Sequence, residues 1–124
     1  MTNYVDGFAL PLPRDDIDAY QNLVKQVAQI WVEYGAVEYR EFICDDPSME
    51  GTRPWNDTLG AQPTETILLG WVAFESREAR DAANAKISAD PRMAELMSGA
   101  QVGFDPTRMA YGGFQKLVDV TRHE

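Results

Sequence analysis

The sequence has only one cysteine, Cys44, and one histidine, His123, among its 124 residues. A single cysteine cannot form a disulfide within the chain, which favours a reducing compartment, and we expect a cytoplasmic protein. Asp45 and Asp46 follow Cys44, and their negative charges disfavour a reactive thiolate. A single histidine in a charged tail argues against Ser-His-Asp or Cys-His catalysis and against multi-histidine metal sites. We therefore expect neither a metal nor a cofactor.

Basic residues and long hydrophobic runs are also scarce. Lys and Arg total 11 against 20 Asp and Glu, so the formal net charge is −9. A nucleic-acid-binding surface needs clustered basic residues to neutralise phosphates, and docking on anionic lipid needs them too. The longest apolar run, Ile67 to Phe74, is far shorter than the ~20 residues of a membrane helix. The first residues lack a basic segment before an apolar run, so we expect no signal peptide. The sequence thus predicts neither a nucleic-acid nor a membrane partner.

Hydrophobic residues make up 44% of the chain and charged residues 25%, which is typical of one soluble domain, here residues 1–124. Their spacing predicts alternating strands and amphipathic helices. The irregular Asp45–Glu65 segment is long enough to cover part of the domain or to belong to an interface, with Trp55 as its anchor. The predicted strands are Tyr4–Leu12, Val37–Cys44, Thr66–Phe74 and Arg108–Val120, and the predicted helices are Asp15–Tyr34, Ser76–Ala89 and Asp90–Gly99.

This order of elements predicts an α+β fold of the ferredoxin-like βαββαβ type, with a four-stranded antiparallel sheet and helices on one face. The strands Tyr4–Leu12 and Thr66–Phe74, which would be central, carry apolar residues on both faces. An apolar sheet face exposed to water is unfavourable for a monomer. We therefore expect a homodimer whose sheets pack face to face as a dimeric α+β barrel. Within the last strand, Gly112-Gly113 predicts a bulge, or else a close approach to the backbone.

Several blocks of the sequence form a recognisable set, which includes Tyr4-Val5-Asp6-Gly7-Phe8, Gly35-Ala36-Val37-Glu38-Tyr39, Asp90-Pro91-Arg92-Met93 and Tyr111-Gly112-Gly113-Phe114. Together they resemble the YbaA-like family, an uncharacterised bacterial family with a domain of unknown function. The resemblance covers nearly the whole chain and implies membership of the dimeric α+β barrel superfamily, but no established activity. That superfamily includes cofactor-free monooxygenases, haem-handling proteins and isomerases, so the fold leaves the function open. Relatives often have histidine where this chain has Tyr34, so no mechanism can depend on an imidazole there.

Asp6 is the most informative polar residue of the predicted strands. Strand alternation puts it on one face with Tyr4 and Phe8, and we expect this face to look into the dimer barrel. A buried carboxylate needs a partner or its pKa rises, and a raised pKa suits a general base. In a structural alternative, Asp6 pairs with Arg108 or bonds to tyrosine or backbone groups. Glu41 allows the same two interpretations.

An aromatic cavity with a few polar groups is the usual form of a small-molecule site, although aromatic strand residues also fill ordinary cores. Acidic residues at one sheet edge, Glu38, Glu41, Asp45 and Asp46, are interpreted as solvated rather than as a metal site. We expect an uncharacterised cytoplasmic homodimer with a pocket for a small organic ligand between sheet and partner, with or without catalysis. The alternative is a non-catalytic interaction or stress-associated module. The candidate pocket residues are Tyr4, Asp6, Phe8, Tyr39, Glu41, Trp71, Arg108 and Tyr111.

Overall fold

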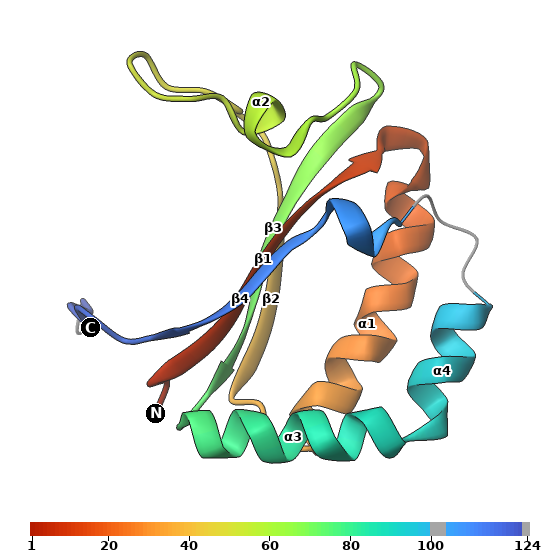
Figure 1. Cartoon of the computed structure of the whole chain (residues 1–124), viewed down its shortest axis with the longest axis vertical. Helices are drawn as coiled ribbons and strands as arrows, with labels where there is room; N and C mark the ends of the chain where they lie inside the picture. The colour runs from red at the N-terminus through yellow and green to blue at the C-terminus, as the bar shows by residue number, and fades with distance from the viewer. Residues whose placement is uncertain (100–103, 123–124) are drawn as a thin grey trace.

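The computed structural model describes residues 1–99 and 104–122 and contains one four-stranded sheet (Figure 1). All neighbouring strands are antiparallel, in the order β2-β3-β1-β4. This arrangement confirms the predicted ferredoxin-like α+β fold. None of the described helices combines the length and the hydrophobicity that crossing a bilayer requires. The elements are β1 (Tyr4–Pro13), α1 (Ile17–Glu33), β2 (Glu38–Ile43), α2 (Trp55–Leu59), β3 (Glu65–Phe74), α3 (Arg77–Ala89), α4 (Pro91–Ser98) and β4 (Ala110–Gln115).

The three longer helices, α1, α3 and α4, all lie on one side of the sheet (Figure 1). Local signals position two of them. The Ser76 hydroxyl caps α3 by accepting the Ala79 N–H at 3.0 Å, and the Asp90 carboxylate caps α4 by accepting the Arg92 N–H at 2.8 Å. Pro91 occupies the first turn of α4, where its missing N–H has no cost. The side of the sheet that these helices cover is called the helix face below.

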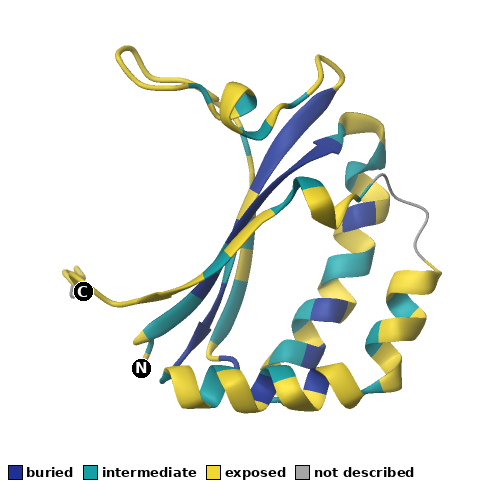
Figure 2. Cartoon of the chain, viewed as in Figure 1, coloured by how far each residue is buried: buried dark blue, intermediate teal, exposed yellow. Residues whose placement is uncertain are grey.

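The hydrophobic core fills the space between the helix face and the helices. Leu10, Leu12 and Phe74 of the two central strands are almost completely buried there, together with Ala83 of α3. Figure 2 shows the same distribution, with buried positions along the middle strands and on the inward sides of α1 and α3. The small Ala83 side chain allows α3 to approach the sheet closely.

The opposite side of the sheet, here called the open face, also carries apolar side chains. Phe42, Leu69 and Phe114 are 51%, 40% and 59% exposed on this face, and Trp71 lies among them. The predicted apolar character of both faces is therefore confirmed. The short helix α2 lies on this side, against β1 and β3, so the prediction that helices cover one face holds only for the longer ones (Figure 1).

Two local predictions are wrong. The segment Asp45–Glu65 contains the helix α2, and Trp55 at its start remains 41% exposed instead of anchoring the segment in the core. The pair Gly112-Gly113 forms no bulge, because β4 keeps an unbroken register with β1. Gly113 is required for another reason: the Tyr4 hydroxyl occupies the place that a Cβ atom would take.

Candidate functional site

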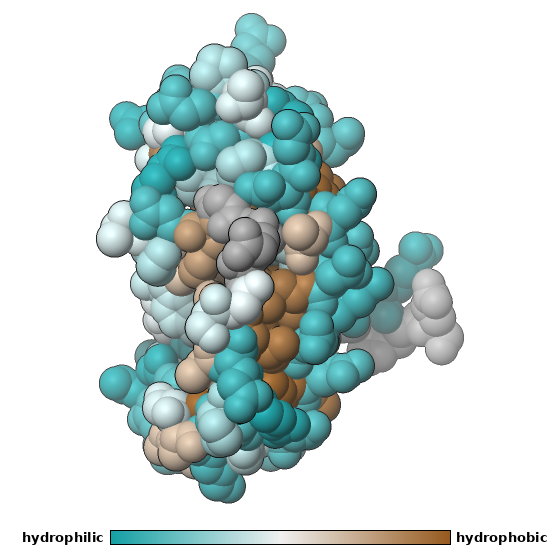
Figure 3. All heavy atoms as spheres, turned by 90° about the vertical axis from the view of Figure 1, so that its right-hand side faces the viewer, coloured by the Kyte–Doolittle hydropathy of each residue, from teal (hydrophilic) through white to brown (hydrophobic). Residues whose placement is uncertain are grey.

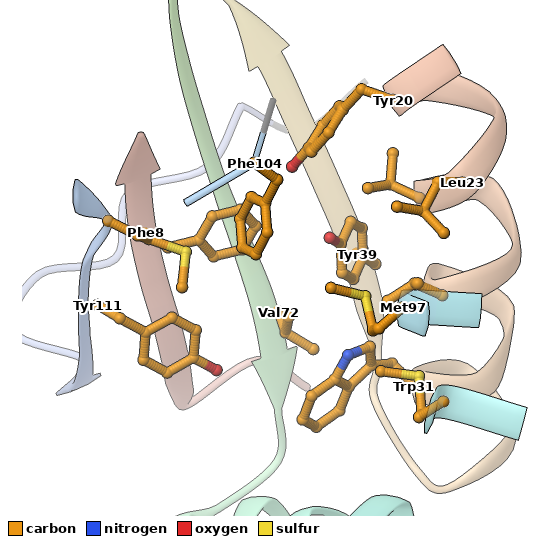
Figure 4. Close-up of a pocket in the computed structure, with 13 residues that line it drawn as sticks. Phe8, Tyr20, Leu23, Trp31, Tyr39, Val72, Met97, Phe104 and Tyr111 are labelled. Atoms are coloured by element: carbon orange, nitrogen blue, oxygen red, sulfur yellow. The ribbon is translucent and has the colours of Figure 1, made fainter. Parts of the chain in front are cut away.

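A cavity of about 160 Å³ lies between the helix face of the sheet and the helices α1 and α4 (Figure 4). Every described side chain that lines it is aliphatic, aromatic or a methionine. Viewed from the side of α4, the surface shows a strip of hydrophobic residues bordered by hydrophilic ones (Figure 3). The lining residues are Phe8, Tyr20, Leu23, Val24, Val27, Trp31, Tyr39, Val72, Met93, Met97, Phe104, Met109 and Tyr111.

Glu41 of β2 supports the polar atoms on one side of the cavity. Its carboxylate accepts hydrogen bonds from the Tyr20 hydroxyl at 2.8 Å and from the Tyr39 hydroxyl at 2.7 Å. Burial raises the pKa of Glu41, although both hydrogen bonds favour its charged form. The neighbouring strand leaves room for this side chain at Gly70, where a Cβ atom would lie 2.6 Å from both Glu41 Cγ and Phe8 Cζ. Glycine at this position therefore helps to shape the site.

Asp6 of β1 supports a second polar group in the same way. Its completely buried carboxylate accepts the Tyr111 hydroxyl at 3.0 Å and the Arg80 guanidinium Nη1 at 3.2 Å. Arg80, from α3, also donates to the Tyr4 hydroxyl at 3.0 Å, and its guanidinium lies 5.0 Å from the centre of the Tyr4 ring. Burial raises the pKa of Asp6 even though Tyr111 and Arg80 both lower it. The structure thus agrees with the structural alternative in giving Asp6 a tyrosine and an arginine as partners, but the arginine is Arg80 and not Arg108.

The contact with Arg80 shows that the prediction for the direction of Asp6 is wrong. Asp6 faces the helices rather than the interior of a dimer barrel, and so do Phe8 and Tyr111. The cavity that these residues line is accordingly formed by the sheet and helices of one protomer. Alternation along a strand shows which residues share a face, but it does not show which face the helices cover.

Trp71 and Arg108, two of the eight candidates, lie away from the cavity. Trp71 points to the open face, where its indole N–H donates to Glu38 at 2.9 Å and its ring lies 5.4 Å from the Phe42 ring. Arg108 pairs with Glu65 and does not pair with Asp6. Of the other six candidates, Phe8, Tyr39 and Tyr111 line the cavity, and Asp6 and Glu41 hold lining tyrosines. Tyr4 accepts a hydrogen bond from Arg80, the partner of Asp6.

Sequence reasoning missed the helical wall of the cavity. Trp31 and Leu23 of α1 and Met93 and Met97 of α4 line it, yet helical apolar spacing is interpreted first as core packing. One signal was available. Tyr20 puts a hydroxyl on an otherwise apolar helix stripe, and a buried hydroxyl needs a polar partner on the opposing sheet.

A polar network fixes α4 against α1 and so positions this wall. The Tyr34 hydroxyl donates to Asp90 at 2.7 Å, at the start of α4. Arg92 bonds to both Asp90 and Glu33, with its Nη2 atom 2.7 Å from Glu33 Oε2. These bonds lower the pKa of Asp90. Tyr34, the position where relatives often have histidine, therefore lies outside the cavity and links the two helices through its hydrogen bond to Asp90.

No group of three or more His, Cys, Asp or Glu side chains is arranged to hold a metal ion within residues 1–99 and 104–122. His123 lies outside these described residues. Glu41 and Asp6 are not among the residues that line the cavity, and their contact with it passes through the tyrosines that they hold. The geometry therefore favours binding through hydroxyl groups and aromatic rings over direct proton transfer to either carboxylate.

The ion pair between Glu65 and Arg108 gives a testable pH dependence. Both guanidinium Nη atoms lie 2.8 Å from the Glu65 carboxylate, and the Gln62 N–H also donates to it, so its pKa falls to about 2. This stabilisation is complete above the ordinary glutamate pKa and is lost as the pH falls through the folded value. We expect Glu65→Gln to lower the free energy of unfolding by about 2 kcal/mol at pH 7.

Urea unfolding of wild type and Glu65→Gln between pH 7 and pH 2 would test this expectation. The difference should shrink from about pH 4.5 to about pH 2, because the carboxyl of the unfolded wild-type chain takes up a proton in this range while that of the folded protein stays charged. Glu75→Gln is a matched control, since the Glu75 side chain is 72% exposed. A difference that stayed constant over this range would contradict the assigned pair.

Comparison with known proteins identifies the relatives of this chain. Uncharacterized protein YbaA of Escherichia coli K12 is 36% identical over 116 residues, which cover 94% of this chain and 97% of that protein. The YbaA protein of Shigella flexneri matches with the same identity and coverage. These matches confirm the resemblance to the YbaA-like family.

Solved structures with low sequence identity share the fold. A monooxygenase from ActVA-Orf6 of Streptomyces coelicolor, solved with the ligand nanaomycin D, has a TM-score of 0.58 at 16% identity, covering 98% of this chain and 94% of its own. A NIPSNAP family protein of unknown function from Agrobacterium tumefaciens has a TM-score of 0.58 at 17% identity, covering 93% and 88%. A dimeric ferredoxin-like protein from an uncultured marine organism has a TM-score of 0.53 at 10% identity, covering 99% and 95%.

The family of the chain is shown by its match to a protein-family model. Residues 3–106, most of the chain, match the model described as a protein of unknown function, DUF1428. Together with the identity to YbaA over almost the full length, this match shows that the chain belongs to the DUF1428 family.

Proposed function

We propose that this protein is a cytoplasmic homodimer in which each protomer binds a small aromatic molecule in the cavity between the sheet, α1 and α4. The observation that carries the proposal is the composition of the cavity wall. Among the described lining residues, the polar side-chain atoms are the indole nitrogen of Trp31 and three tyrosine hydroxyls, each held by the carboxylate of Glu41 or Asp6. A mostly apolar wall with a few fixed polar groups is typical of small-molecule sites.

The size of the cavity limits the ligand to about one ring. Its volume is about 160 Å³, and an apolar protein cavity of about 150 Å³ accommodates benzene. The aromatic wall, which includes Phe8 and Phe104, suits stacking or edge contacts with such a ring. The Streptomyces monooxygenase of the same fold was solved with a bound ligand, which supports the general compatibility of this fold with a ligand site.

The homodimer is supported by the open face of the sheet. Phe42, Leu69 and Phe114 are partly exposed there, and a contiguous apolar patch on a soluble protein is characteristic of a protein interface. A second copy of this chain would cover the patch with the same residues, as a two-fold interface requires. The dimeric ferredoxin-like neighbour supports the same assembly. The single cysteine supports the cytoplasmic location.

Toluene is the simplest probe of the cavity, and Leu23→Phe is the variant that tests it. Leu23 lines the cavity from α1, so a phenyl group at this position would occupy part of the space. We expect wild type to bind one toluene per protomer and Leu23→Phe to bind it at least about tenfold more weakly, as measured by isothermal titration calorimetry.

Val32→Phe provides the matched control. Val32 lies on the same helix, is 51% exposed and does not line the cavity, so this variant should bind toluene like wild type. Thermal melting of all three proteins would show that they are folded. If wild type bound no toluene, or if both variants bound it equally well, the cavity would not be the ligand site.

A further inference from the structure

The hydrogen atoms of the three cavity-lining tyrosine hydroxyls all point to carboxylates. Tyr20 and Tyr39 donate to Glu41, and Tyr111 donates to Asp6. A tyrosine hydroxyl has one hydrogen to donate and two lone pairs that accept. Because each hydrogen is already used, these hydroxyls can offer only their oxygen lone pairs to a molecule in the cavity. In Figure 4 the hydroxyl ends of all three rings are directed toward the central space.

A neutral ligand cannot easily redirect these hydrogens. A hydrogen bond to a charged carboxylate is roughly twice as strong as one between neutral groups. The Tyr20 and Tyr39 hydroxyls each bond to a different oxygen of Glu41, at 2.8 and 2.7 Å, so neither hydroxyl competes with the other for its acceptor. A carbonyl oxygen placed beside these tyrosines would meet lone pairs and lose its hydrogen bonds to water without replacement.

The negative charge of Glu41 also disfavours one class of ligand, that with an anionic group. Among residues 1–99 and 104–122, no basic side chain forms an ion pair with Glu41, whereas Asp6 has Arg80. An anionic group on the ligand would therefore approach an uncompensated negative charge in a poorly solvated space.

We infer that the natural ligand is a small aromatic alcohol, phenol or amine, which presents a hydrogen-bond donor to the tyrosine oxygens, and that carbonyl and carboxylate analogues bind more weakly. This inference rests on the proposed function, because it assumes that the cavity binds a ligand. The indole N–H of Trp31 is a donor on the same wall, so an acceptor group of the ligand would be directed to Trp31.

Benzyl alcohol and benzaldehyde make a matched pair for the test, because both carry one oxygen on one carbon beside a benzene ring. Only the alcohol has a hydrogen to donate. We expect wild type to bind benzyl alcohol about three- to tenfold more tightly than benzaldehyde, the range of one net hydrogen bond. Benzylamine should bind at least as tightly as the alcohol, and benzoate should bind more weakly than benzaldehyde.

Glu41→Gln is the decisive variant, because an amide has one accepting oxygen and one donating nitrogen. The glutamine can accept one tyrosine hydroxyl but must donate to the other, whose hydrogen then becomes free for the ligand. We expect benzaldehyde to bind about three- to tenfold more tightly to Glu41→Gln than to wild type, with little change for benzyl alcohol. Trp31 is present in both proteins, so a hydrogen bond from its N–H would contribute equally to both affinities and would not change their ratio.

Glu38→Gln is the control, since it makes the same substitution on the same strand but on the open face, and it should leave both affinities unchanged. Tyr39→Phe is a second test that does not depend on the glutamine. It removes one accepting oxygen and should weaken benzyl alcohol alone, by about two- to tenfold.

The outcomes separate the two proposals. If toluene binds but the affinity ratio of alcohol to aldehyde is the same in wild type and Glu41→Gln, the donor requirement is wrong and the proposed function stands. If neither toluene nor any of the substituted rings binds, the proposed function fails and this inference fails with it.

Discussion

Leu69→Asp is expected to convert the proposed homodimer into monomers. Leu69 lies on the open face of the central strand β3, directly opposite Phe42 of β2, and is 40% exposed in one protomer. A carboxylate at this place would lose its water in the dimer without gaining a cation, which costs several kcal/mol for a buried unpaired charge. Two-fold symmetry introduces the substitution twice. We therefore expect the dimer dissociation constant to rise at least about 100-fold.

Sedimentation equilibrium at micromolar concentrations would measure this change. Val32→Asp is the matched control, because Val32 is also a partly exposed apolar residue but lies on α1, on the opposite side of the sheet. Val32→Asp should remain dimeric, and Leu69→Asp should keep the melting profile of a folded domain. A wild-type protein that sedimented as a monomer, or a dimeric Leu69→Asp, would exclude the open face as the interface.

Arg80→Met is expected to cause the largest loss of stability. Arg80 is the cation that compensates Asp6, whose carboxylate has no exposed surface, and it also donates to the Tyr4 hydroxyl. Removing one partner of a buried ion pair leaves an uncompensated charge and typically costs about 3 to 5 kcal/mol of unfolding free energy. Urea unfolding at pH 7 would measure the loss. Arg77→Met on the same helix should change stability by less than about 1 kcal/mol, because the Arg77 side chain is 69% exposed.

The pH dependence of this variant has a definite sign. Burial already raises the pKa of Asp6, and without Arg80 the pKa rises further. The folded protein then binds a proton that the unfolded chain releases, so lowering the pH from 7 toward 4 should recover part of the lost stability. The double variant Asp6→Asn with Arg80→Met should also recover much of it, because no buried charge remains. A deficit that was independent of pH and unchanged in the double variant would contradict this account.

The fold was predictable from local patterns because the signals that define it act over a few residues. Apolar spacing marked the helices, Ser76 and Asp90 marked two helix starts, and right-handed crossovers leave few ways to connect the strands. The glycine pair in β4 is an exception. Gly112-Gly113 suggests a bulge when considered alone, but Gly113 is small because the Tyr4 side chain lies against it from the neighbouring strand.

The candidate site was predictable only in part. Phe8, Tyr39 and Tyr111 were correctly grouped, because cross-strand register brings residues of one strand face together. Trp71 was grouped with them wrongly, since its strand presents it to the other face. The helical wall was missed because a periodic apolar stripe predicts that a helix packs against the sheet, but it does not indicate whether a cavity remains between them.

The sequence by itself determined the order of the four strands and the three longer helices, the apolar character of both sheet faces, and the exclusion of disulfides within the chain. Only the tertiary structure decided which face the helices cover and which charges meet. Asp6 and Arg80 are 74 residues apart, and Glu41 and Tyr20 are 21 apart, so no local propensity relates them. The twist of the sheet and the packing of the helices bring these groups together, and that placement leaves three tyrosine oxygens facing a cavity.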